Sequence, residues 1–108
     1  MVKFDHLRLP VSNLTRSRRW YLDTRTLALQ DDEGFTIFLQ KAGSAVQPHG
    51  YALWFQVVDV AATFAEWSAR GVEFSHGPRK SYWGYGAELK DPDGYLVRLW
   101  DERSMKEK

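Results

Sequence analysis

The clearest candidates for chemistry are Glu88 and Arg98, two opposite charges separated by ten residues and a tight turn. Residues 91–94, Asp-Pro-Asp-Gly, form that turn, because proline fixes φ, glycine permits a positive φ and the aspartates can cap backbone amides. Antiparallel strands on either side of the turn would place Glu88 opposite Arg98. Two interpretations stay open: a structural ion pair, or a pair that grips an anionic or planar ligand.

Large aromatic side chains accompany this pair on the predicted strands and rims. Trp54, Trp83 and Trp100, together with Phe38 and Tyr85, offer flat faces on which an aromatic or heteroaromatic ligand could stack. If a partner chain closes this side of the sheet, the same rings form the core of an interface instead. The sequence does not choose between a ligand pocket and a dimer interface.

The histidines give weaker signals. His6 is interpreted as a structural residue satisfied by a neighbour, with a general base or hydrogen-bond donor as the alternative. His49 and His76 lie beside glycine and proline and are predicted in exposed loops, and residues 83–86 are predicted to form a rim loop. No serine–histidine–aspartate spacing is recognisable, and the chain has no cysteine that could serve as nucleophile or metal ligand.

The elements that must position these residues follow from periodicity and from capping signals. Alternation of period two indicates strands, and Ser12 or Asn13 and Asp59 suit helix N-caps. The charged segment 102–108 is predicted to fray. The predicted elements are strands at 4–11, 51–58 and 72–74, hairpins around turns 31–34 and 91–94, and helices at 13–23 and 60–70.

The chain contains two unequal copies of one unit. An offset of 60 aligns Leu39 with Leu99, and an offset of 46 aligns Leu7 with Leu53, so the copies differ by 60 − 46 = 14 residues. We therefore predict an α+β domain over residues 1–108, built from two tandem βαβββ modules of which the first lacks its second strand. Module one spans about 1–42 and module two about 50–102, and together they form a cup-shaped mixed sheet with helices outside.

Residue parity assigns the two faces of this sheet. Along each strand, alternate residues face opposite sides of the sheet. The residues on one side are almost wholly apolar and form the core, whereas those on the other side combine aromatic rings with polar side chains, as ligand sites do. The candidate ligand-binding residues are His6, Arg8, Phe38, Trp54, Gln56, Trp83, Glu88, Arg98 and Trp100.

Composition limits the class of protein. A chain of 108 residues with 44% hydrophobic residues can bury a core, and a net charge of +1 gives no case for nucleic acid or membrane partners. The arginines on the first helix are interpreted as a solvated face rather than a phosphate-binding patch. The opening residues lack the apolar run of a signal peptide, so cytoplasm is the expected compartment. The missing strand exposes the edge of 26–30, which predicts a symmetric or strand-exchanged homodimer.

Several short motifs in this order resemble a known family. Residues 4–7, 55–60, 83–84 and 91–95 are similar to motifs of the vicinal oxygen chelate superfamily, which includes glyoxalase I, bleomycin resistance proteins and extradiol dioxygenases. The resemblance implies a metal held by histidine or glutamate from the first and last strand of each module. His6 matches one such position, but the other three carry Phe38, Ala52 and Arg98, which cannot coordinate a cation.

The replaced positions favour a binding protein over an enzyme. The expected function is metal-independent sequestration of an aromatic or drug-like ligand, as in the bleomycin resistance branch, with an implied role in antibiotic resistance and with no cofactor. The alternative is a lyase, isomerase or dioxygenase that holds a divalent ion such as Zn, Ni, Fe or Mn with His6 and an unusual ligand set. A further alternative is a truncated variant or scaffold with no ligand.

Overall fold

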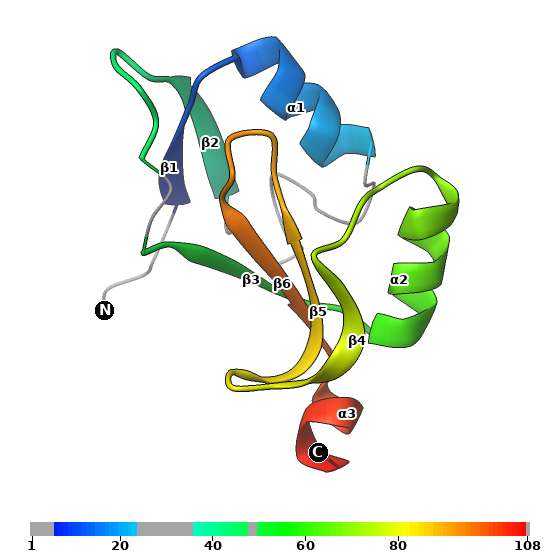
Figure 1. The fold of residues 1–108 in the computed structure, drawn as a ribbon. Coiled ribbons are helices and arrows are strands. Elements are labelled where there is room, and N and C mark those ends of the chain that lie inside the picture. Colours follow the sequence, from blue (N-terminus) through cyan, green and yellow to red (C-terminus); the bar gives the residue numbers. More distant parts are fainter. Residues whose placement is uncertain (1–5, 24–35, 48–49, 108) are drawn as a thin grey trace. The chain divides into compact units, whose positions relative to one another are not determined.

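The computed structural model describes residues 6–23, 36–47 and 50–107 of an α+β fold. The chain forms two compact units, residues 1–47 and 48–108 (Figure 1). The predicted cup-shaped sheet would join both units, and it stays a prediction. His49 and the predicted strand edge at 26–30 lie outside the described residues, so the predictions made for them are not tested. Among the described residues, no helix combines the length and apolar character needed to cross a membrane.

The first unit pairs two parallel strands beside one helix. Strands β1 (His6–Val11) and β2 (Thr36–Lys41) pair in parallel, and helix α1 (Leu14–Asp23) lies between them in the chain. The Asn13 side chain accepts a hydrogen bond from the Arg16 amide at 2.9 Å, which confirms the predicted N-cap. Among the described residues of this unit, the buried ones come from both strands and one helix face: Leu9, Val11, Ser17, Tyr21 and Ile37.

The second unit is a four-stranded sheet in the order β3-β6-β5-β4. Its elements are β3 (Ala52–Gln56), α2 (Val60–Ala69), β4 (His76–Ser81), β5 (Gly84–Lys90), β6 (Leu96–Trp100) and α3 (Glu102–Glu107). Strand β6 pairs in parallel with β3 and antiparallel with β5, and α2 lies alongside β4 (Figure 1). The fully buried side chains include Val60 and Trp67 on α2 and Leu89, Val97 and Leu99 on the sheet.

The β5–β6 turn forms as predicted, and one aspartate organises it. The buried Asp91 carboxylate accepts the amides of Asp93 and Tyr95 at 2.9 Å each, and Gly94 has φ +93°. Burial and the nearby carboxylates of Asp91 and Asp93 raise the pKa of Tyr95. This turn fixes the antiparallel register that carries the candidate site.

The two predicted sequence offsets also reproduce the strand pairing. In the first unit Leu7 pairs with Ile37, and in the second Leu53 pairs with Val97. Adding 46 to a residue number in β1 gives the equivalent residue of β3, and adding 60 to a residue number in β2 gives the equivalent residue of β6. The β1–β2 pairing converted in this way is the β3–β6 pairing. Both units therefore place their first strand beside their last in the same alignment.

Three local predictions were wrong. Residues 72–74 are not a strand; Phe74 instead packs against Phe64 and Trp67, with ring centroids 4.8 and 6.3 Å away. The additional strand is β4, so His76 lies in the sheet and is half-buried rather than exposed in a loop. Residues 84–86 belong to β5, so Trp83 is the one residue of the predicted 83–86 rim that lies in the two-residue turn 82–83.

The predicted fraying of the C-terminus was also wrong, because Asp101 anchors helix α3. Its buried carboxylate accepts the Ser104 amide at 2.6 Å and the Val60 amide at 2.7 Å, so it caps the first turns of two helices. Burial by itself would raise the pKa of Asp101, but the two backbone hydrogen bonds, the Ser104 hydroxyl and Arg103 outweigh it and lower this pKa.

Candidate ligand site in the second unit

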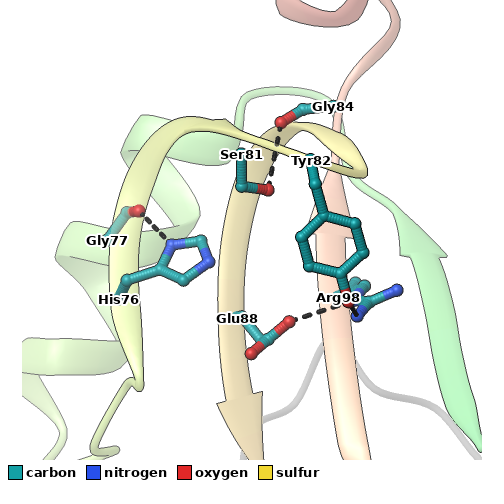
Figure 2. A network of polar contacts seen from close by, with 7 residues as sticks. All are labelled: His76, Gly77, Ser81, Tyr82, Gly84, Glu88 and Arg98. Carbon is teal, nitrogen blue, oxygen red and sulfur yellow. Dashed lines mark hydrogen bonds and ion pairs between the residues drawn. The ribbon is translucent and has the colours of Figure 1, made fainter.

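Arg98 is the centre of a polar cluster on the second sheet (Figure 2). It is only 8% exposed. Its Nε donates to Glu88 Oε2 at 3.0 Å, and its Nη2 donates to the Tyr82 hydroxyl at 2.8 Å. Glu88 and Arg98 are in register across β5 and β6, which confirms the cross-strand pair predicted from the turn.

Three aromatic rings surround the guanidinium. Its Cζ lies 5.4 Å from the ring centroid of Trp54, 5.5 Å from that of Tyr82 and 5.2 Å from that of Trp83. Trp54 and Trp83 meet edge to face, with centroids 5.1 Å apart. Because these rings favour a cation within about 6 Å, they offset part of the cost of burying Arg98.

Two members of this cluster were not among the predicted site residues. His76 lies in register with Glu88, its ring is tilted against Trp83 at 6.2 Å, and its Nδ1 is 2.8 Å from the Gly77 carbonyl. Since a carbonyl only accepts, Nδ1 carries a proton. Tyr82 projects from the β4–β5 turn over Arg98 although it is 90% exposed (Figure 2). No motif in the sequence marks Tyr82, because its position depends on the length of that turn.

The structure brings together four of the nine predicted site residues: Trp54, Trp83, Glu88 and Arg98. Two others, Gln56 on β3 and the half-buried Trp100 on β6, are in register with each other on the same sheet. Three lie in the first unit: Arg8 and Phe38, which are in register on β1 and β2 and exposed, and His6, whose backbone begins β1.

The residues at the predicted metal positions do not fit a divalent cation. Phe38 on β2 and Ala52 on β3 have no donor atom, and the Arg98 guanidinium is cationic and already bound to Glu88. Within the described ranges no three histidine, aspartate or glutamate side chains are grouped as a metal site requires. The side chains of the Arg98 cluster therefore offer a ligand hydrogen bonds and aromatic stacking.

Comparison with known proteins identifies the class. Paired strands of matched register with flanking helices are consistent with the vicinal oxygen chelate fold. The family model described as the glyoxalase/bleomycin resistance protein/dioxygenase superfamily matches residues 3–99. The chain belongs to this superfamily. No curated protein sequence is similar enough to count as a relative.

Solved structures share the fold at low sequence identity. TnmS3, an antibiotic binding protein from Streptomyces sp. CB03234, is 24% identical with a TM-score of 0.73, over 94% of this chain and 96% of its own. A possible glyoxalase from Bacillus cereus is 17% identical with a TM-score of 0.73, over 92% and 98%. A protein of unknown function from Agrobacterium tumefaciens str. C58 is 23% identical with a TM-score of 0.70, over 94% and 95%.

Proposed function

We propose that this protein binds an aromatic or drug-like small molecule without a metal ion. The observation that carries the proposal is the Arg98 cluster: a guanidinium held by Glu88 stands among Trp54, Tyr82 and Trp83, where a metal-dependent relative would need a ligand. Aromatic faces supply affinity through stacking and burial, and a few fixed polar groups set orientation. That combination suits binding better than catalysis.

The superfamily contains both binding proteins and metalloenzymes, so the side chains at the candidate site must indicate which of the two functions this protein has. Support for binding comes from the donor-free side chains of Phe38 and Ala52 and from the ion pair that engages Arg98. The solved structure of an antibiotic binding protein with the same fold is compatible with such a role. A soluble cytoplasmic homodimer is part of the proposal, and size exclusion with light scattering tests the dimer directly.

A thermal-shift screen with native mass spectrometry tests the function. A ligand present at ten times its Kd should stabilise the native state by about 1.4 kcal/mol, which raises the midpoint of a domain this size by roughly 5–10 °C. Protein purified without chelators should carry no stoichiometric metal by elemental analysis. Near-stoichiometric Zn, Ni, Fe or Mn, or a screen of aromatic drug-like compounds without any stabilising member, would contradict the proposal.

A further inference from the structure

Four side chains form one transverse row across the second sheet. His76 is in register with Glu88, Glu88 with Arg98, and Arg98 with Trp54, so the row crosses β4, β5, β6 and β3. Residues in register on neighbouring strands project from the same face. One face therefore presents an imidazole, a carboxylate, a guanidinium and an indole side by side.

Arg98 has hydrogen-bonding capacity that the described residues do not use. A guanidinium has five N–H groups, and the structure supplies acceptors for two of them, Nε through Glu88 and one on Nη2 through Tyr82. No side-chain nitrogen or oxygen of the described residues is both fully buried and without a partner, so Nη1 is within reach of solvent. A mostly buried guanidinium with three unused donors is suited to an oxygen-rich ligand.

The neighbouring rings restrict the shape of that ligand. Trp54 remains 45% exposed beside the guanidinium, so part of this residue is accessible to a ligand next to the unused donors. Glu88 occupies Nε and holds the guanidinium in place, which leaves Nη1 and Nη2 for a group with two oxygens. The complementary ligand is flat and has paired acceptor oxygens at one edge.

We propose that this row binds the carboxylate of a planar aromatic acid, with the two oxygens accepting hydrogen bonds from Nη1 and Nη2 of Arg98 and the ring stacked on Trp54. This inference rests on the proposed small-molecule function and names the class of ligand for the same site. The Arg98–Glu88 pair is neutral overall, so the ligand is recognised by directed hydrogen bonds and stacking rather than by a surplus of positive charge.

Three probes with one ring and different head groups test the inference on the wild-type protein: 2-naphthoate, 2-naphthamide and 2-naphthamidinium. Titrations followed by NMR of the Arg98 Nε–H and the Trp54 indole N–H should give a Kd for naphthoate at least about 10-fold below that for the amide. The amidinium should not perturb the Arg98 signal. Equal affinities for acid and amide would overturn the inference and leave the proposed function standing, whereas a protein that no aromatic compound stabilises would overturn the function itself.

Variants separate the charge from the hydrogen-bond geometry. Arg98→Lys keeps the charge but loses the paired N–H groups, and should weaken naphthoate at least 10-fold. Glu88→Gln removes a nearby negative charge and should tighten naphthoate about 3-fold while leaving the amide unchanged. Arg70→Gln, at the exposed C-cap of α2, is the matched control and should change the affinity of neither probe. Unchanged naphthoate binding in a folded Arg98→Lys variant would contradict the proposed contact.

Discussion

Removing one partner of the Glu88–Arg98 pair should destabilise the protein more than removing both. The side chains are only 10% (Arg98) and 16% (Glu88) exposed, so either one left alone is a largely desolvated charge. Breaking a buried pair costs about 3–5 kcal/mol, and the residual exposure lowers this to about 2–3 kcal/mol here. For a domain of this size that corresponds to roughly 10–20 °C in the unfolding midpoint.

A double-mutant cycle with Glu88→Leu and Arg98→Met measures this coupling. The free energy of unfolding comes from urea titrations followed by far-ultraviolet circular dichroism, and the double variant should recover about 2 kcal/mol relative to the sum of the single changes. The exposed Glu66–Arg70 pair at the C-terminal end of α2 is the control on the same chain, with an expected coupling of about 0.3–0.5 kcal/mol. A Glu88–Arg98 coupling no larger than the control would refute the account of a desolvated pair.

Three further predictions concern the scaffold. Asp101→Asn should lower the free energy of unfolding by about 1–3 kcal/mol, because the carboxylate oxygen that accepts the Val60 amide is lost. Since the pKa of Asp101 is lowered in the folded state, the wild type should lose this stabilisation as pH falls below about 4, whereas the variant should not. Urea titrations of both proteins at pH 7 and pH 3 would show the difference. The raised pKa of Tyr95 gives stability that is present below pH ~10 and lost above it, so Tyr95→Phe should flatten the alkaline limb of the stability curve, and an unchanged limb would argue against this assignment. Gly86→Ala should prevent folding or lower the free energy of unfolding by more than about 3 kcal/mol, because the added methyl group would overlap a backbone carbonyl of β6. Gly43→Ala is the control: Gly43 has open space around it, so this variant should keep the melting midpoint of the wild type.

The sequence predicted best what depends on the spacing of residues along the chain. The Asp-Pro-Asp-Gly turn at residues 91–94 sets the register of β5 and β6, and that register pairs Glu88 with Arg98. The two repeat offsets likewise determine which residues of the first and last strands are paired. Such features need only the period of a strand and the position of a turn, both of which are visible in the order of residue types.

The part of the site that sequence analysis missed depends on the edge of the sheet. Gly77 and Pro78 follow His76 and indicate a loop, but β4 is an edge strand, where the proline nitrogen needs no acceptor in the ladder. The register also shifts between His76 and Arg79, which interrupts the regular alternation. Local signals therefore predict a loop where pairing with β5 produces a strand, and His76 joins the row only through that pairing.

The two units share a strand register but differ in how each holds an arginine. At equivalent positions, the first unit pairs Arg8 with Phe38 and the second pairs Trp54 with Arg98, so each has a cation beside an aromatic ring, on exchanged strands. The offset of 60 aligns Ala28 with Glu88, so the first module has no carboxylate at the equivalent sequence position. Arg98 is buried against that carboxylate, whereas Arg8 is exposed. The shared register supplies the positions, and a single acidic residue on β5 allows one of them to hold a desolvated guanidinium, because burial of a charge requires a partner.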